Sequence, residues 1–256
     1  HAFLWTPGVG MRDLGTLGGR DSSAADLNAS GYVVGKAQRA DGIDRAFLWR
    51  PGTGIRDLGA LTGDESRASA INDSGQVAGW FQSEESYCCA RAFRWSPEEG
   101  MRDLFTSFTG AAYAYTVYSV DLNEAGQVAG KLGGYAPEGG EDDYLFVWDP
   151  DKGLLPVTFT ALDLNGHPVD LNDAGQLAGT MHYWDEHGHG YWPERAFRWS
   201  AAEGIRDLGS LGSRMSVGLA INNAGEVVGV TPRRDQPDRH AFVWDPERGM
   251  RDLGTL

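Results

Sequence analysis

The sequence has 256 residues, a formal net charge of −14 at pH 7 and a pI of about 4.7. Such an acidic surface repels a phosphate backbone, so we expect no nucleic-acid partner. Hydrophobic residues account for 41% of the chain, enough for a core, and no stretch approaches the roughly 18 apolar residues that cross a bilayer. The composition therefore predicts one folded domain over residues 1–256, without a membrane span.

The first predicted element is the aromatic string HAFLW at residues 1–5. Phe3 and Trp5 lie two residues apart, so both rings face the same side of a strand, and that side must be buried. The string recurs as RAFLW at 45–49, RAFRW at 91–95, YLFVW at 144–148, RAFRW at 195–199 and HAFVW at 240–244. Six copies indicate an internal repeat.

A short turn containing Gly, and in most copies Pro, follows each aromatic string and leads to a second string, first seen as Met11-Arg12-Asp13-Leu14. Equivalent strings stand at 55–58, 101–104, 205–208 and 250–253, whereas Leu155-Pro156 replaces Arg-Asp in the copy at 153–156. Neighbouring residues on a strand point to opposite faces, so one ligand cannot easily meet both Arg and Asp. We therefore expect a repeated salt bridge between strands or between blades.

The third element is an Asn-x-x-Gly turn followed by a Val- or Ala-rich run that ends in Gly. Its copies begin at Asn28, Asn72, Asn123, Asn172 and Asn222, 44 to 51 residues apart. Gly supplies a left-handed conformation and the Asn side chain bonds to nearby backbone, which predicts a hairpin followed by a bulge. Asp26, Asp121 and Asp170 stand two residues before the turn. We expect them to pair with Arg of the next blade, or else to line a central channel.

Together these elements predict an all-β fold, a β-propeller of four-stranded blades, because the repeat length is typical of such blades. Five complete repeats are expected at 22–61, 66–106, 116–160, 167–211 and 216–256, after a half-repeat at 1–19. Either the chain is a piece of a protein with six or more blades, the missing half lying beyond Leu256, or five blades close and the half-repeat packs elsewhere. An exposed strand edge there favours pairing with another chain.

The linked motifs H/R-A-F-x-W, R-D-L-G-x-L and I/L-N-x-A/S-G-x-V-x-G resemble those of the HAF-repeat family, and His-Ala-Phe itself stands at 1–3 and 240–242. The resemblance covers essentially the whole chain. Proteins of that family are described as probable extracellular bacterial repeat proteins, so the resemblance implies a secreted or cell-surface location and no particular reaction. Tyr144-Leu145 and Leu155-Pro156 depart from the pattern, which marks their repeat as distorted or specialised.

The segment 182–192 departs most from the repeat. Its aromatic residues offer flat rings for stacking on a sugar, and these are Tyr183, Trp184, Tyr191 and Trp192. Its imidazoles and carboxylates are suited to a divalent metal such as Ca²⁺ or Zn²⁺, and these are His182, Asp185, Glu186, His187 and His189. The spacing matches no established zinc pattern. The alternative is a long hairpin whose rings cover the blade edge and whose polar residues face water.

Two other features carry weaker signals. The acidic stretch Glu138-Gly139-Gly140-Glu141-Asp142-Asp143 is either a Ca²⁺-binding loop or a solvated loop, and it lacks the spacing of a dedicated calcium loop. Cys88 and Cys89 are the only cysteines, and they form either a vicinal disulfide or two free thiols.

No nucleophile elbow, P-loop, dinucleotide fingerprint or HExxH motif occurs in the sequence. We therefore expect a non-catalytic extracellular binding or surface module that engages a glycan or a protein through its blade loops. One alternative is a structural, self-assembling repeat protein that pairs through its incomplete blade. Another is a metal-dependent hydrolase or lyase that uses the segment 182–192.

Overall fold

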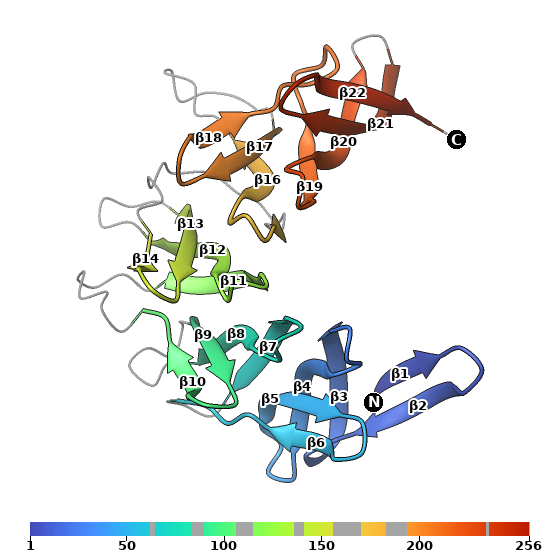
Figure 1. Cartoon of the computed structure of the whole chain (residues 1–256), viewed down its shortest axis with the longest axis vertical. Coiled ribbons are helices and arrows are strands. Elements are labelled where there is room, and N and C mark those ends of the chain that lie inside the picture. Colours follow the sequence, from blue (N-terminus) through green and yellow to red (C-terminus); the bar gives the residue numbers. More distant parts are fainter. Residues whose placement is uncertain are drawn as a thin grey trace. The chain divides into compact units, whose positions relative to one another are not determined.

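The computed structural model describes residues 1–61, 65–82, 90–105, 115–135, 141–155, 170–182, 194–233 and 236–255. Within these ranges every regular element is a β-strand, and the strands form six sheets (Figure 1). The described ranges accordingly contain no helix that could cross a membrane.

The first sheet is a two-stranded hairpin of β1 (Ala2–Thr6) and β2 (Gly10–Gly15), which we refer to as the N-terminal hairpin. Five four-stranded sheets follow, and in each the strands are paired in chain order; we refer to them as blades 1 to 5. Blade 1 contains β3 (Gly18–Leu27), β4 (Val33–Arg39), β5 (Asp44–Arg50) and β6 (Gly54–Asp57). Blade 2 contains β7 (Ser66–Ile71), β8 (Val77–Gln82), β9 (Ala90–Ser96) and β10 (Gly100–Asp103).

Blades 3 to 5 repeat the arrangement. Blade 3 contains β11 (Tyr115–Leu122), β12 (Val128–Tyr135), β13 (Glu141–Asp149) and β14 (Gly153–Leu154). Blade 4 contains β15 (Asp170–Leu171), β16 (Leu177–His182), β17 (Glu194–Ser200) and β18 (Gly204–Asp207). Blade 5 contains β19 (Val217–Ile221), β20 (Val227–Arg233), β21 (Gln236–Asp245) and β22 (Gly249–Gly254). The predicted all-β fold of five complete four-stranded repeats and an N-terminal half is therefore confirmed.

The chain divides into two compact units. Unit 1 comprises His1–Val128 with Trp148–Leu154, and unit 2 comprises Ala129–Val147 with Leu155–Leu256. Each unit is described by itself below. The expectation of a single domain over residues 1–256 stays a prediction.

A glycine in the second strand lets each blade pack closely. In the four described pairings, the glycine that ends the Val- or Ala-rich run lies opposite the Phe of the aromatic string: Gly35 opposite Phe47, Gly79 opposite Phe93, Gly179 opposite Phe197 and Gly229 opposite Phe242. A Cβ on Gly79 would overlap the carbonyl oxygen of Arg67 in the first strand and would lie 2.9 Å from the Phe93 ring. The first, second and third strands therefore approach so closely here that only glycine fits in the second strand.

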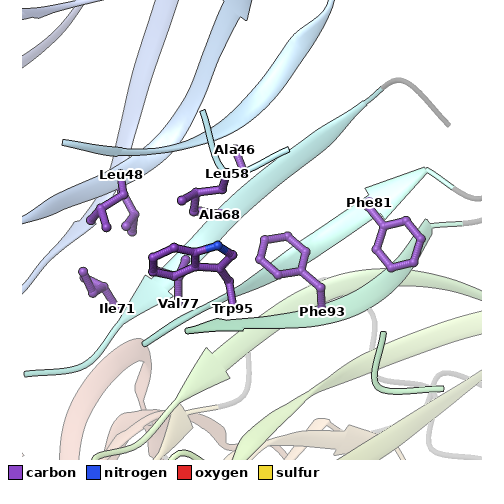
Figure 2. Packing of buried hydrophobic residues seen from close by; sticks show 10 residues of the cluster. Ala46, Leu48, Leu58, Ala68, Ile71, Val77, Phe81, Phe93 and Trp95 are labelled. Carbon is purple, nitrogen blue, oxygen red and sulfur yellow. The ribbon is translucent and has the colours of Figure 1, made fainter. Parts of the chain in front are cut away.

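The hydrophobic core of each unit lies between successive blades. Between blades 1 and 2, one cluster contains Ala46, Leu48, Leu58, Phe93 and Trp95 (Figure 2). Between blades 4 and 5, an equivalent cluster contains Ala196, Leu208, Phe242 and Trp244. In both clusters the Phe and the Trp come from the later blade, so the two rings face the preceding blade. Successive side chains of a strand point to opposite faces, so the two-residue spacing of Phe and Trp places both rings on this buried face.

Candidate functional site

The segment with the predicted sugar and metal ligands connects the second and third strands of blade 4. His182 ends β16 and pairs with Glu194, the first residue of β17. Tyr183, Trp184, Asp185, Glu186, His187, His189, Tyr191 and Trp192 belong to the connection 183–193, which lies outside the described residues, as does the side chain of His182. Their proposed roles stay predictions. The structure shows that one residue pair anchors both ends of the connection.

The equivalent connection differs in length between blades. It joins Gln38 to Asp44 in blade 1, Gln82 to Ala90 in blade 2 and Arg233 to Gln236 in blade 5. In each case these two residues form the last pair of their strand ladder, so the connections all leave from the corresponding end of a blade. We refer to them, together with 136–140 and 183–193, as the variable connections. The segment 183–193 is the longest of the five.

The other sequence candidates are only partly described. Cys88 and Cys89 lie in 83–89, and residues 138–140 lie in 136–140, so both fall outside the described residues. Glu141, Asp142 and Asp143 belong to β13, so the predicted acidic loop is wrong in its second half, because β13 extends beyond the aromatic string toward the connection. In the described ranges no group of three or more His, Cys, Asp or Glu residues is placed to hold a metal ion.

The turn asparagines stabilise the hairpin between the first and second strands. In blade 2, Asn72 Oδ1 accepts the N–H of Gln76 at 2.9 Å, and the Asn72 carbonyl oxygen accepts the N–H of Gly75 at 3.0 Å. Gly75 has a φ of +74°, a left-handed conformation that favours glycine. The predicted function of both turn residues is confirmed. The expectation that a bulge follows the turn is wrong, because the bulge precedes it in the first strand, between Ala68 and Ala70.

The same asparagines also join successive blades. Asn28 Nδ2 donates to the carbonyl oxygen of Asn72 at 3.0 Å, and Asn72 Nδ2 donates to that of Asn123 at 3.1 Å. In unit 2, Asn172 Nδ2 donates to the carbonyl oxygen of Asn222 at 2.9 Å. We refer to this series as the asparagine ladder. The repeated Asn thus stabilises its own turn and also binds the turn of the next blade.

In blades 1, 2 and 5 a serine six residues before the turn asparagine forms a second repeated contact. Ser66 Oγ donates to the carbonyl oxygen of Gly59 at 2.6 Å and accepts the N–H of Ala46 at 3.0 Å. Ser22 does the same with Gly15 (2.6 Å) and Ala2 (2.9 Å), and Ser216 with Gly209 (2.6 Å) and Ala196 (3.0 Å). The N-terminal hairpin is therefore attached to blade 1 by the contact that joins complete blades.

The aspartates of the Arg-Asp-Leu strings bond within their own blade or hairpin. Their partner is the first residue of the aromatic string, in the pairs His1–Asp13 (2.8 Å), Arg91–Asp103 (2.9 Å), Arg195–Asp207 (3.2 Å) and His240–Asp252 (3.0 Å). The predicted salt bridge between strands is present in the two Arg copies, and a His–Asp hydrogen bond occupies the same place in the other two. Since either His or Arg supplies an N–H group at this place, the alternation of His and Arg in the sequence is explained. Bonds from the N–H of Gly254 and from the His240 ring lower the pKa of Asp252.

The arginines of the same strings contact the next blade instead. Their guanidinium groups lie over the Trp of the following aromatic string, in the pairs Arg12–Trp49 (4.8 Å), Arg56–Trp95 (5.5 Å), Arg102–Trp148 (5.3 Å) and Arg206–Trp244 (4.9 Å to the ring centroid). Where Leu155 replaces Arg, it packs against the cluster that contains Trp199. An apolar side chain thus substitutes for a cation–π contact.

The aspartates that precede the turns bond to main chain, not to Arg. Asp26 Oδ2 accepts the N–H of Ile71 in blade 2 at 2.9 Å, and Asp170 Oδ2 accepts the N–H of Ile221 in blade 5 at 2.6 Å. The expected pairing of Asp26 and Asp170 with Arg of the next blade is therefore wrong. The physical reason is that β7 and β19 are edge strands, so alternate backbone N–H groups have no partner strand on their open side and donate to the carboxylate instead.

The N-terminal hairpin exposes the face that is buried in complete blades. Phe3 is 54% and Trp5 60% exposed, whereas the equivalent Phe47 and Trp49 in blade 1 are 0% and 2% exposed. Met11 is also exposed. The expectation that this face is buried is therefore wrong for Phe3 and Trp5, because no blade of the described chain packs against it.

No family model matches the chain, and no curated protein matches its sequence. Among solved structures, the chain is similar to the β-propeller domain of the Trilobed protease from Pyrococcus furiosus, with a TM-score of 0.53, 10% identity and coverage of 91% of this chain and 71% of that one. It is also similar to puromycin hydrolase, with a TM-score of 0.55, 14% identity and coverage of 100% and 42%. A third similar structure, Pyrococcus horikoshii acylaminoacyl peptidase, has a TM-score of 0.51, 10% identity and coverage of 90% and 39%. These similarities establish the β-propeller fold.

Proposed function

We propose that this chain is a non-catalytic extracellular or cell-surface binding module that engages a glycan or a protein through its variable connections. One observation carries the proposal. The repeated Asn, Ser, Asp and Arg residues bond to other parts of the scaffold in the copies described above, so they maintain the fold. Segments that differ between repeats are then the natural place for a ligand.

We also propose that the chain is a member of the HAF-repeat family. The structural roles of the three motifs support it, because each residue that the repeat shares with that family has a contact to maintain. His240 and Arg195, for example, occupy the same position and bind the aspartate of the same string. We propose the extracellular location on the same ground.

The variable connection 183–193 is the proposed ligand-binding segment. Four aromatic rings, at Tyr183, Trp184, Tyr191 and Trp192, match the stacking surface that a sugar ring needs. Its attachment at the pair His182 and Glu194 holds both ends of the segment at one point of the blade.

The test is binding to a glycan array by the wild-type chain and by a triple variant, Trp184→Ala/Tyr191→Ala/Trp192→Ala. We expect the variant to lose binding by tenfold or more and to keep the wild-type melting temperature, because these residues lie outside the repeat motifs. The control is Val9→Ala, an exposed residue in the turn between β1 and β2 and outside the variable connections, which should bind like the wild type. A triple variant that binds normally would overturn the assignment, and so would a wild-type chain that binds neither a glycan nor an extracellular protein.

Self-assembly is a second candidate function, because both halves of a blade-to-blade interface are exposed. Phe3 and Trp5 expose one half, and in blade 5 Val228 and Leu253 expose the other. Their counterparts in blade 1, Val34 and Leu58, are buried in the cluster with blade 2. Such a surface pairs head to tail with a second copy.

Sedimentation velocity over a hundredfold concentration range tests assembly. We expect oligomers that disappear in a Phe3→Ser/Trp5→Ser variant and in a Leu253→Ser variant. A chain that stays monomeric at all concentrations contradicts this candidate.

A further inference from the structure

The fourth residue of the aromatic string faces the next blade, and two kinds of residue occupy this place. Leu48 lies in the cluster between blades 1 and 2, and Val147 lies in the cluster that contains Trp199 of blade 4. In the two RAFRW copies the residue is an arginine, whose guanidinium lies over the Trp of the following aromatic string: Arg94 over Trp148 at 5.9 Å and Arg198 over Trp244 at 5.4 Å to the ring centroid. We refer to these two contacts as the arginine junctions.

Each arginine junction contains a buried charge. Arg94 and Arg198 are 9% and 5% exposed, and a charged group in a protein interior loses the free energy of its hydration. The Nε atoms of both arginines have no hydrogen-bond partner in the described chain. The arginine of the Arg-Asp-Leu string lies over the same ring, as Arg206 does over Trp244 at 4.9 Å. Two positive charges therefore share one apolar ring at the junction.

A glutamate of the arginine's own blade supplies the opposite charge. Arg94 Nη1 lies 3.2 Å from Glu99 Oε2, and Arg198 Nη2 lies 2.6 Å from Glu203 Oε2. Both glutamates belong to the turn between the third and fourth strands, where blades 1, 3 and 5 have Thr53, Lys152 and Arg248. The ion pair thus lies within one blade and does not join that blade to the next.

This arrangement lowers the free energy that is needed to separate the two blades. When Leu48 leaves blade 2, its apolar surface returns to water, which is unfavourable. When Arg198 leaves Trp244, its guanidinium recovers hydration and keeps the ion pair with Glu203, and this gain offsets the lost cation–π contact. An arginine junction therefore opens more readily than a junction with an aliphatic residue at the same place.

The inner ends of blades 4 and 5 are joined by other contacts. Asn172 Nδ2 donates to the carbonyl oxygen of Asn222, and Asp170 Oδ2 accepts the N–H of Ile221. These bonds come from the first strands and the turns that follow them, whereas Arg198 and Trp244 belong to the third strands. Separation at the third strands leaves the bonds of the first strands in place, so those bonds can act as a hinge.

We propose that the arginine junction between blades 4 and 5 is a seam, at which the third strands of the two blades part under native conditions while their first strands stay bonded. The contact of Arg94 with Trp148 has the same parts and forms a second copy of the seam. This conformational device goes beyond the proposed binding function and does not depend on it.

Native-state cysteine labelling measures the opening directly. Ala46 and Ala196 occupy the same place in their strings, are both 0% exposed, and lie in the clusters of junctions 1–2 and 4–5. Ala46→Cys and Ala196→Cys are made separately in the full chain with Cys88→Ser/Cys89→Ser, and their reaction with a thiol reagent is followed without denaturant. We expect Ala196→Cys to react at least tenfold faster. Equal rates, or a faster reaction at Ala46→Cys, would overturn the proposal.

Exchange of the junction types controls for the position of each blade in the chain. Arg198→Leu/Glu203→Thr gives blade 4 the residues of blade 1 and should slow the labelling of Ala196→Cys at least tenfold. Leu48→Arg/Thr53→Glu makes the reverse exchange and should accelerate the labelling of Ala46→Cys by a similar factor. Circular dichroism shows which variants are folded. An unchanged labelling rate in either folded exchange variant contradicts the seam, and each exchange is a sufficient test without the other.

Discussion

Replacement of Asn72 by alanine is the sharpest probe of the asparagine ladder. Asn72 is 2% exposed, and its side chain makes three hydrogen bonds: to Gln76 Oε1 (2.9 Å), to the carbonyl oxygen of Asn123 (3.1 Å) and from the N–H of Gln76 (2.9 Å). A net hydrogen bond contributes about 0.5–1.5 kcal/mol, and a buried group left without a partner costs at least as much. We therefore expect Asn72→Ala to lower the free energy of unfolding by about 3 kcal/mol.

Asn222→Ala is the matched control. Asn222 occupies the same turn in blade 5, and its side chain makes three hydrogen bonds, all within that turn. This side chain is exposed and donates to no other blade among the described residues. Water replaces such bonds, so the expected loss is about 1 kcal/mol. Both losses are measured by urea unfolding followed through tryptophan fluorescence. Equal losses in the two variants, or a loss below about 1 kcal/mol for Asn72→Ala, would refute the ladder as a source of stability.

Three further predictions concern the other repeated contacts and the undescribed connection. Arg56→Ala should lower the free energy of unfolding by about 0.5–1 kcal/mol through loss of the contact with Trp95, whereas Arg20→Ala, at an exposed arginine of β3, should lose less; equal values in urea unfolding would contradict this. Hydrogen bonds lower the pKa of Asp149, Asp245 and Asp252 below the ordinary 3.8, so their stabilisation is complete above that pH and is lost as the pH falls through the lowered values; Asp252→Asn should flatten the drop in melting temperature between pH 5 and pH 2, and an unchanged drop contradicts the assignment. If the connection 183–193 holds a divalent metal, calorimetry with Zn²⁺ or Ca²⁺ should show one site that is lost in His187→Ala/His189→Ala, and an identical titration of the variant excludes those ligands.

Elements with a strong local pattern were predictable from the sequence. The two-residue spacing of Phe93 and Trp95 indicates a strand with one buried face, and the Asn-x-x-Gly turn indicates a hairpin with Gly in a left-handed conformation. Both signals lie within a few neighbouring residues, and repetition distinguishes them from chance. For this reason the strands, their order in the blade and the surplus half-repeat followed from the sequence alone.

Contacts between blades were not predictable in the same way. Arg56 and Asp57 are neighbours in the string, yet Arg56 contacts Trp95 of the next blade, and aspartates at the equivalent position bind the first residue of their own aromatic string. Asp26 bonds to a backbone N–H on the open side of the edge strand β7, and no side-chain pattern in the sequence indicates that group. Partners of this kind depend on the register and the bulges of two sheets, which a linear pattern does not contain.

The candidate ligand site shows the other limit. The segment 183–193 was singled out by composition, because it interrupts the repeat with rings, imidazoles and carboxylates. It has no periodicity from which the direction of a side chain could be derived. Its two ends, in contrast, are fixed by the strand pair His182 and Glu194.

Residue-resolved hydrogen exchange of the chain tests the central claim most directly, namely that the N-terminal hairpin is half of a repeated unit, in which β1 pairs with β2 alone among the described strands. The account predicts that the amides of Phe3 and Trp5 exchange orders of magnitude faster than those of the equivalent residues Phe93 and Trp95, which are paired with β8. Comparable protection of the two sets of amides would contradict it.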